Sequence, residues 1–291
     1  MHGQEIKNIL LIVKTGHPTA WNLALELASW LEQRGICAKL VEHSCGHGGL
    51  DDCIVQRPDL ILVLGGDGTI LSVARLTFEL SIPLLGLNMG KVGFLAGIDR
   101  KDWLAQMGVI LKKGLAIQPR AVLQYSLERA SRVILSGVAV NDLVVNRGRL
   151  ARLIHTELLV EGEFLSHIRS DGLIISTPTG SSGYSLSAGG PIMDPRVEAY
   201  LVTPICPIMN DMKPLILPLA STCLLRLTGR VGERYMTVDG QEGFKLRYND
   251  CLTVKMSDKK LLLAGLPEQG YFSNLRRKGF MGHAFQDTEG A

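Results

Sequence analysis

The sequence predicts an α/β domain, built on a parallel Rossmann-like sheet, followed by an all-β sandwich domain. Two observations support this prediction. From Asn8 to Lys112, apolar strand-like runs alternate with helical segments, which is typical of a parallel sheet with right-handed crossovers. Beyond Gly114, the stretches are short, β-rich and separated by glycines and polar turns, which favours an antiparallel sandwich. A chain of 291 residues has room for two domains of ordinary size.

The elements of the first domain follow from its apolar runs and from the residues that end them. A leucine-rich and β-branched run begins at Asn8, and Gly35 ends the helix that follows it. Asp99 stands at the start of an amphipathic helix, where a capping carboxylate is favourable. We therefore expect strands at 8–13, 36–41, 60–64 and 83–87, and helices at 19–34, 70–80 and 99–112. We also expect a glycine-rich loop at 88–97 to lie beside a second glycine-rich turn at 65–69.

The second domain is expected to consist of short strands, and the chain then ends in a helical segment. Tyr271 to Lys278 has helical composition, and we expect it to pack back on the first domain. The expected division is 1–115 and 116–267 for the two domains, with 268–291 as the C-terminal segment. Among the strands that the alternating pattern indicates are 122–129, 133–135, 142–146, 155–160, 173–177, 223–227 and 252–256.

One glycine-rich turn stands out because a continuous apolar run leads straight into it. Residues 60–64 are all apolar, as in a central parallel strand covered on both faces, and Gly-Gly-Asp-Gly-Thr follows them. The turn then lies at the carboxyl edge of the sheet, where glycines let backbone N–H groups approach a phosphate. Asp67 is the only side chain in the turn that is placed to do chemistry. The expected phosphate-binding residues are Gly65, Gly66, Gly68 and Thr69.

A plain βα turn is the alternative interpretation of the same five residues. Asp67 or Thr69 would then only cap the helix that follows. The spacing also differs from two familiar nucleotide-binding patterns, since neither G-x-G-x-x-G nor G-x-x-x-x-G-K-[ST] fits the turn. The turn is therefore neither a dinucleotide fingerprint nor an ordinary P-loop.

Composition excludes several classes of protein. With 46% hydrophobic and 20% charged residues, the chain has the composition of a soluble globular protein, and no apolar run approaches the length of a membrane span. The formal net charge of +3 is small and evenly spread, so neither nucleic acid nor a membrane is an expected partner. The stretch from Met1 to Lys7 lacks the basic start of a signal peptide, and we expect a cytoplasmic protein.

The six cysteines are far apart in the sequence and form no C-x-x-C pair, as expected of reduced thiols in the cytoplasm. His43, Cys45, His47 and Cys53 do cluster in a glycine-rich segment, and imidazole with thiolate could hold zinc. Their spacing is poor for one tetrahedral site, so we expect a surface loop and no protein-bound metal.

A second polar segment, residues 176–191, lies between strongly apolar sequences. It reads STPTGSSGYSLSAGGP, and so many hydroxyls and glycines cannot form a core. A pocket for ribose or phosphate would use them, since hydroxyls and N–H groups satisfy sugar and phosphate oxygens and Tyr184 offers a ring face. A long hydroxyl-rich loop without a ligand is the alternative.

Taken together, these motifs resemble those of bacterial NAD kinases, in the same order and over nearly the whole chain. The turn at 65–69 is shared with diacylglycerol and sphingosine kinases and, more distantly, with 6-phosphofructokinases, so it indicates phosphoryl transfer more than a substrate. The segment at 177–191 is more discriminating, although Ser182-Gly183 stands where Thr-Ala is commoner and Asp142 where glutamate is frequent. The matching motifs are Gly65 to Thr69, Asn88 to Leu95, Asn141-Asp142, Arg169 to Gly172, Thr177 to Pro191 and Asp239-Gly240-Gln241.

The resemblance implies a phosphotransferase that moves the γ-phosphate of ATP to the 2′-hydroxyl of the adenosine ribose of NAD, giving NADP. It also implies an N-terminal α/β domain, a C-terminal β-sandwich, a homodimer or homotetramer, and NAD bound between the domains. Asp67 would be the catalytic base. The residues implied around NAD are Asp67, Gly68, Asn141, Asp142, Ser182, Gly183, Tyr184, Ser185, Leu186, Ser187 and Gln241, with Arg152, Arg169 and Asp171 contributing in part from a neighbouring subunit.

The expected chemistry can also be argued from the residues alone. A hydroxyl that attacks the γ-phosphate of ATP needs positioning and charge neutralisation more than covalent help. Asp67 can orient that hydroxyl and accept its proton, while Mg²⁺ or another divalent cation enters bound mainly to ATP oxygens. A lipid or sugar kinase that shares only the 65–69 turn, and a non-catalytic dinucleotide-binding protein, remain alternatives. The sequence leaves open whether polyphosphate replaces ATP, whether NADH is accepted, and how NADP(H) feeds back on activity.

Overall fold

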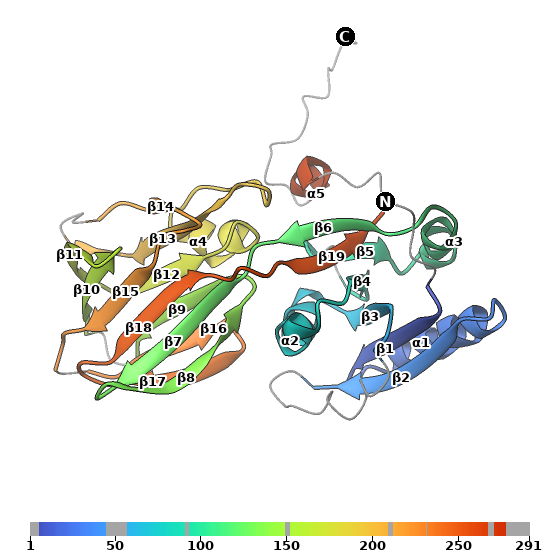
Figure 1. Cartoon of the computed structure of the whole chain (residues 1–291), viewed down its shortest axis with the longest axis horizontal. Helices are drawn as coiled ribbons and strands as arrows, with labels where there is room; N and C mark the ends of the chain where they lie inside the picture. The colour runs from blue at the N-terminus through green and yellow to red at the C-terminus, as the bar shows by residue number, and fades with distance from the viewer. Residues whose placement is uncertain are drawn as a thin grey trace, which may run out of the picture. The chain divides into compact units, whose positions relative to one another are not determined.

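A mostly parallel sheet and an antiparallel sandwich occupy different parts of the chain in the computed structural model (Figure 1). The structure describes residues 6–44, 57–90, 93–148, 152–208, 212–230, 232–266 and 271–277. The chain divides into two units, of which the first comprises Met1–Leu76, Ile82–Gln118 and Leu262–Ala291, and the second Thr77–Ser81 and Pro119–Leu261. The fold class predicted from the sequence is confirmed.

Seven strands form the sheet of the first unit. They are β1 Asn8–Lys14, β2 Cys37–His43, β3 Leu60–Gly65, β4 Leu84–Asn88, β5 Ala96–Asp99, β6 Ala116–Arg120 and β19 Leu261–Gly265. The helices are α1 Pro18–Glu32, α2 Asp67–Thr77 with the 3₁₀ helix η2 Phe78–Leu80 directly after it, α3 Trp103–Lys113 and α5 Tyr271–Arg277. The strand order is β2-β1-β3-β4-β19-β6, and β5 pairs with the end of β4. β1, β2, β3 and β4 run parallel to their neighbours, and β5 and β19 run parallel to β4.

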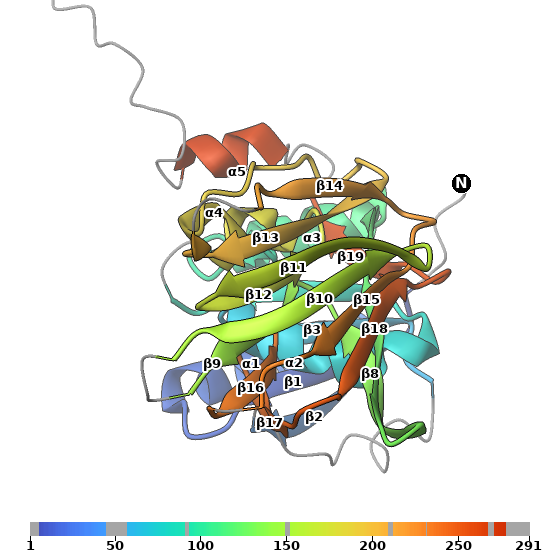
Figure 2. The same cartoon turned by 90° about the vertical axis from the view of Figure 1, so that its left-hand side faces the viewer.

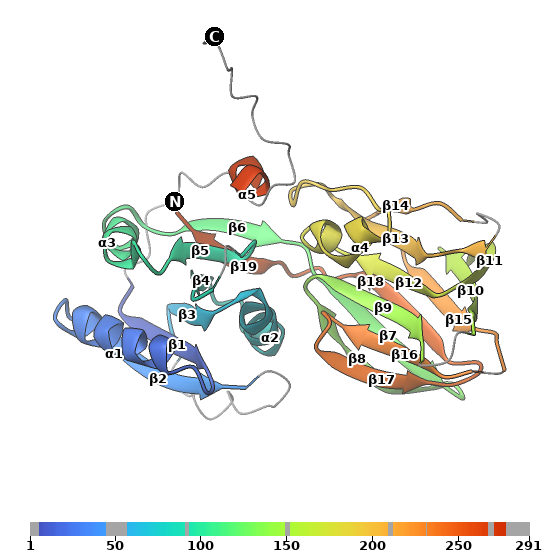
Figure 3. The same ribbon diagram turned by 180° about the vertical axis from the view of Figure 1, so that it is seen from behind.

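Helices cover both faces of this sheet, so its central strand is buried on each side. Every residue of β3 is buried. Apolar residues of α1 and α3 share one core with Leu62 and Leu64 of β3, and Figure 3 shows α1 lying over β1 and β2. On the other face, Ile70 of α2 lies so near β4 that a Cβ at Gly86 would be 2.4 Å from its Cδ1. The turn after β3 therefore projects from the carboxyl edge of a sheet that is held firmly on both sides.

Two six-stranded antiparallel sheets form the second unit. One contains β7 Leu123–Arg129, β8 Arg132–Ala139, β10 Ile154–Val160, β11 Glu163–Ser170, β15 Cys223–Leu227 and β18 Cys251–Met256. The other contains β9 Asp142–Arg147, β12 Gly172–Ser176, β13 Ala199–Ile205, β14 Leu215–Pro218, β16 Arg234–Val238 and β17 Glu242–Leu246. The strand order of the first of these sheets is β11-β10-β15-β18-β7-β8, and Figure 2 shows several of its strands side by side. The strand order of the other sheet is β14-β13-β12-β9-β16-β17. Alternate residues of both sheets, such as Leu143 and Leu225, point into one shared core.

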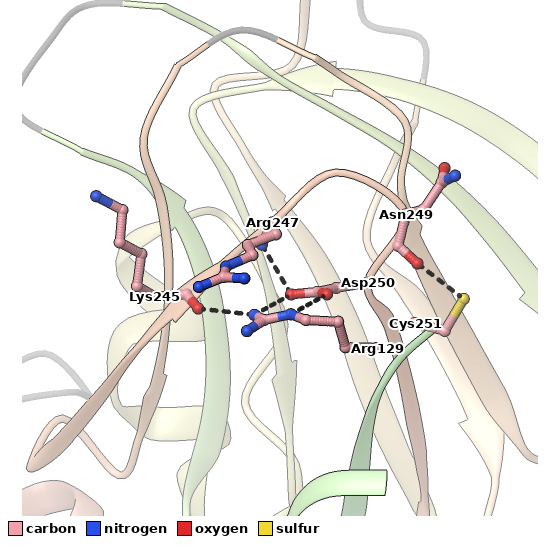
Figure 4. Close-up of polar contacts among 6 residues, drawn as sticks. All are labelled: Arg129, Lys245, Arg247, Asn249, Asp250 and Cys251. Carbon is pink, nitrogen blue, oxygen red and sulfur yellow. Dashed lines mark hydrogen bonds and ion pairs between the residues drawn. The ribbon is translucent and has the colours of Figure 1, made fainter. Parts of the chain in front are cut away.

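A buried carboxylate fixes one turn of the sandwich (Figure 4). Asp250 stands between β17 and β18 and is fully buried. Its Oδ1 accepts a hydrogen bond from Arg129 Nε at 2.8 Å, and its Oδ2 accepts one from Arg129 Nη2 at 2.7 Å and one from the backbone N–H of Arg247 at 2.7 Å. A bidentate pair of this kind fixes geometry as well as adding energy. It ties the end of β7 to the turn between β17 and β18.

The structure corrects several expected boundaries in the first unit. The glycine-rich loop expected at 88–97 ends in a strand, because β5 pairs with β4. The sandwich expected to run to residue 267 ends at Leu261, because β19 pairs with Leu84 and Leu85 of the parallel sheet. The helix expected from Ile70 begins at Asp67. The helix expected at 99–112 begins at Trp103, because Asp99 is the last residue of strand β5.

Other elements lie close to their expected places. The first helix begins at Pro18, one residue earlier than expected, and His17 Nδ1 caps it by accepting the N–H of Ala20 at 3.2 Å. α5 belongs to the first unit, and its Leu275 is buried. None of the helices in the described ranges has both the length and the apolar character that crossing a membrane requires.

Candidate active site

Asp67 is held in place by a neighbouring loop of the first unit. It is the first residue of α2 and follows the two glycines at the end of β3. Its Oδ2 accepts the backbone N–H of Phe94 at 2.8 Å, and its Oδ1 accepts that of Leu95 at 3.2 Å. The two glycine-rich loops therefore lie side by side, as the sequence predicts. They fix a half-buried carboxylate at the carboxyl edge of the sheet.

The glycines around Asp67 differ in what surrounds them. A Cβ at Gly93 would lie 2.2 Å from Asp67 Oδ1, and one at Gly65 would lie 2.7 Å from Oγ1 of the buried Thr69. These two positions favour glycine because a side chain approaches closely, that of Thr69 in the same turn at Gly65 and that of Asp67 at Gly93. Gly66 and Gly68 are exposed at the start of α2, where a phosphate can reach the backbone.

His43 is the described member of the His/Cys cluster that the sequence singles out. It is buried at the end of β2, and its Nε2 forms a 2.9 Å hydrogen bond with Ser72 Oγ on α2. Burial, and then the charge of Arg75, lowers the pKa of His43. The other members lie outside the described residues: Cys45, His47 and Cys53. Within the described ranges, no three His, Cys, Asp or Glu side chains gather to hold a metal ion.

In the second unit, Asp239 fixes the backbone around Asn141 and Asp142. Its Oδ1 accepts the N–H of Asn141 at 2.7 Å and that of Asp142 at 3.1 Å, and its Oδ2 accepts the N–H of Val140 at 3.1 Å. Three consecutive backbone donors thus converge on one buried carboxylate. This arrangement fixes the direction in which β9 begins.

The Asp142 side chain is buried on the outer face of its sheet. Leu143 and Val145 point into the sandwich core, so Asp142 points to the opposite face, where it is only 8% exposed. Burial, and then the nearby charge of Asp239, raises the pKa of Asp142 to about 7. A carboxyl group in this position titrates near neutral pH.

The hydroxyl-rich segment begins directly against Asn141. The N–H of Thr177 donates to the carbonyl of Asn141 at 2.9 Å, and Thr177 Oγ1 donates to the carbonyl of Val140 at 2.7 Å. A Cβ at Gly180 would lie 2.1 Å from the Asn141 carbonyl oxygen, so only glycine allows this approach. The structure thus brings together two motifs that are far apart in the sequence.

The rest of this segment is ordered by its own hydroxyls. It contains the 3₁₀ helix η3 Gly180–Ser182 and the short helix α4 Tyr184–Ser187. Ser181 Oγ accepts the N–H of Met193 at 2.9 Å, and Ser185 Oγ lies 2.8 Å from Thr203 Oγ1 on β13. Ser185, an expected NAD contact, is therefore engaged within the protein. The expected contacts that reach the surface, wholly or in part, are Ser182, Gly183, Tyr184, Leu186 and Ser187.

Asp171 is paired with an arginine that the sequence does not single out. Arg147 Nε lies 2.8 Å from Asp171 Oδ1, and its Nη2 donates to Oδ2 at 3.2 Å. Arg169 is exposed on the edge strand β11, and Arg152 is exposed shortly before β10. Gln241 is half-buried in the turn between β16 and β17.

Sequence reasoning missed the groups that hold the site residues in place. Phe94 and Leu95 act through backbone N–H groups, which leave no side-chain signature. Asp239 bonds to residues 97 to 99 positions earlier in the chain. Its place in the Asp239-Gly240-Gln241 motif is the signal that could have found it, whereas no motif marks Arg147.

Comparison with known proteins relates both parts of the chain to one family. Residues 47–114 match the model of the ATP-NAD kinase N-terminal domain, and residues 140–266 match that of the C-terminal domain. A curated NAD kinase of Nitratidesulfovibrio vulgaris is 43% identical over 276 residues, which cover 95% of this chain and 97% of the relative. The NAD kinase of Oleidesulfovibrio alaskensis is 41% identical over 281 residues, covering 97% and 95%.

Solved structures share the architecture. Yeast NADH kinase, crystallised with NADH, superposes with a TM-score of 0.84 at 26% identity, covering 98% of this chain and 91% of that one. An NAD kinase from Archaeoglobus fulgidus, crystallised with ATP, has the same fold, with a TM-score of 0.70 at 22% identity over 92% of this chain and 99% of that one. With matches to both domain models and relatives above 40% identity over nearly its whole length, the chain belongs to the ATP-NAD kinase family.

Proposed function

We propose that this protein is an NAD kinase, which transfers the γ-phosphate of ATP to the 2′-hydroxyl of the adenosine ribose of NAD and yields NADP. Its family membership over nearly the whole chain supports the proposal, as does the NADH bound by its structural relative from yeast. The structural observation that carries it is the Asp67 carboxylate, which two backbone N–H groups fix beside the exposed Gly66 and Gly68.

In this proposal Asp67 orients the acceptor hydroxyl and takes its proton. Its two oxygens accept the backbone N–H groups of Phe94 and Leu95, and a carboxylate can accept several hydrogen bonds at once. A phosphoryl-transfer transition state is stabilised mainly by positioning and electrostatics, so a base with a fixed orientation is what the reaction needs. Gly66 and Gly68, at the N-terminus of α2, would face phosphate oxygens.

We propose MgATP as the donor, with Mg²⁺ or another divalent cation held mainly by phosphate oxygens. Mg²⁺ is commonly bound by one or two carboxylates together with substrate phosphates. The turn at 65–69 contains a single carboxylate, that of Asp67, which fits this mode of binding. The cation would neutralise charge on the group that is transferred.

For NAD, we propose that Asn141 and Asp142 bind ribose hydroxyls and that Tyr184 offers a ring face to a base. The Tyr184 side chain is 47% exposed, so its ring is open to a partner. Ser185 would hold the segment through Thr203. Further contacts carried over from the family are Arg152, Arg169, Asp171, Ser182, Gly183, Leu186, Ser187 and Gln241, in a homodimer or homotetramer in the cytoplasm.

A coupled assay tests the proposal. Purified protein is incubated with NAD and MgATP, and NADP is detected with an NADP-specific dehydrogenase. We expect NADP to form only when both ATP and a divalent cation are present. Parallel reactions with polyphosphate as donor, and with NADH, a diacylglycerol or a sugar as acceptor, define the specificity. Phosphorylation of the lipid or sugar without NADP formation would refute the proposal.

A further inference from the structure

Asp142 is a buried carboxyl group that accepts no hydrogen bond from the described residues. It is 8% exposed, whereas its neighbour Asp239 accepts three backbone N–H bonds. One of those bonds, at 3.1 Å, comes from the backbone of Asp142 itself, so the two carboxyl groups share one small region. Asp239 therefore has donors that suit a carboxylate, whereas the described part of the chain offers none to Asp142.

Among the described residues, the elements packed around Asp142 do not supply a compensating positive charge. Ser176 lies directly opposite it on β12, and its buried hydroxyl has no hydrogen-bond partner within the described structure. The residues that follow, 177–180, carry no titratable side chain. On β16, Tyr235 is the titratable residue of the same face, but it pairs with Asn146, four residues further along β9. Asp239 is thus the charged group that acts on Asp142 among the described residues.

We propose that Asp142 binds NAD as a neutral carboxylic acid, that Asp239 positions it and keeps it neutral, and that NAD binding consequently takes up a proton. This inference rests on the proposed function, in which Asn141 and Asp142 bind NAD hydroxyls. A protonated carboxyl group can donate one hydrogen bond to a hydroxyl and accept another. NAD also displaces water from Asp142 and brings an anionic pyrophosphate, and both effects disfavour a second negative charge beside Asp239.

The direction of the pH dependence follows from linkage. The acid form of Asp142 binds NAD, so the affinity for NAD is highest at pH values below the pKa of Asp142. It decreases as the pH rises through that pKa. Titration calorimetry of the full chain with NAD, at pH 6, 7 and 8 in two buffers of different ionisation enthalpy, measures both affinity and proton exchange. We expect proton uptake near pH 7 and affinity that is up to about tenfold weaker at pH 8 than at pH 6. A flat affinity profile without proton uptake overturns the proposal.

Two variants separate protonation from a merely structural role. Asp142→Asn keeps the shape of the acid but does not titrate, so it should bind NAD without proton uptake and keep its pH 6 affinity at pH 8. Asp239→Asn removes the neighbouring charge, so the step in affinity should move to lower pH. If Asp239 has only a structural role, Asp239→Asn should bind NAD more weakly at every pH, and the decrease in NAD affinity should occur at the same pH as in the wild-type protein. Proton uptake that persists in Asp142→Asn overturns the proposal even if Asp239→Asn does not fold.

Asp194→Asn is the matched control. Asp194 lies near the end of the hydroxyl-rich segment, but hydrogen bonds from Arg196 lower its pKa, so it does not titrate in this range. This variant should keep the wild-type dependence of NAD affinity and proton uptake on pH. The NADP assay distinguishes failure of this inference from failure of the proposed function. NADP formation together with pH-independent NAD binding refutes only the inference, whereas proton-coupled NAD binding without NADP formation refutes only the function.

Discussion

Asp67 and Asp142 are two carboxyl groups whose surroundings suit them to different tasks. Asp67 is half-buried and accepts two backbone N–H bonds, whereas Asp142 is buried without a donor from the described residues. Active sites commonly use such contrasts to give two carboxyl groups unlike roles. We expect Asp67 to serve as the base and Asp142 to serve as a neutral hydrogen-bonding group for NAD.

Substituting Asp67 by asparagine tests the first of these roles. The side chain keeps its size but loses its charge and its ability to take a proton. The rate of phosphoryl transfer should fall by roughly 10²–10⁴, as for a lost positioned base. NAD affinity should change little, because the dinucleotide keeps its other contacts. Single-turnover kinetics with saturating NAD and MgATP, beside direct NAD titration, measure both quantities. A folded variant with the wild-type rate would remove Asp67 from the mechanism.

Gly93→Ala tests whether the loop that holds Asp67 controls the rate. The new Cβ would lie 2.2 Å from Asp67 Oδ1, so the carboxylate or the loop must shift. A displacement of about 1 Å near the reacting group can cost on the order of 10²-fold in rate, and we expect a loss of that size. Gly90→Ala is the control in the same loop, since its Cβ meets nothing within 4 Å. Equal rates for the two variants would contradict the positioning role.

At the scale of elements, a helix or strand is easier to predict from the sequence when its partners lie close to it in the chain. β3, the 65–69 turn and α2 are contiguous, so one apolar run and its glycines suffice to predict them. β19 is a five-residue apolar stretch that by pattern looks like another strand of the sandwich, and its true partners, Leu84 and Leu85, lie far earlier in the chain. The contacts of Asp239 are hard to predict for a similar reason, because a motif marks the residue but its partners are distant backbone groups.

The turn between β17 and β18 should be a point of high stability. Asp250→Ala removes three hydrogen bonds and leaves Arg129 without its carboxylate. Because the Arg129 side chain is 27% exposed and can turn to water, we expect the loss to be about 1.5–3 kcal/mol of unfolding free energy, as for hydrogen bonds to a charged group. Urea denaturation followed by circular dichroism measures the loss. Arg196→Met breaks the pair between Arg196 and Asp194 at the surface and should leave the unfolding midpoint unchanged. Equal effects of the two variants would contradict this account.

At the scale of the whole molecule, the sandwich is an insertion into the parallel α/β unit. The chain leaves the first unit after Gln118 and returns to it at Leu262. The sandwich also exposes large apolar side chains on three strands that end a sheet, β8, β11 and β14. Exposed apolar edges are typical of surfaces that pair with another chain. The side chains concerned are Val133, Ile134, Phe164, Leu165 and Ile216.

We therefore expect a homo-oligomer that depends on these edges. Light scattering after size exclusion should give a mass of two or four chains of 31.7 kDa. Phe164→Asp on β11 should reduce that mass, because a charge then interrupts the apolar edge. Phe272→Asp on α5 is the control, since the two phenylalanines are similarly exposed, at 55% and 57%. A monomeric wild-type protein would refute the prediction.

The inserted sandwich also determines the order in which a growing polypeptide can complete its two units. β19 lies between β4 and β6 in the first sheet, yet it is made after every other described strand. The strands of the sandwich are all present once Met256 has been synthesised, while the first sheet still lacks the strand that joins β6 to β4. N-terminal domains usually fold first during synthesis, but here the N-terminal unit must wait for the C-terminal end of the chain. Until then Leu84 and Leu85 of β4, which pair with β19 and not with β5, lack their partner strand. An unpaired stretch of strand edge is the kind of surface that chaperones protect during translation.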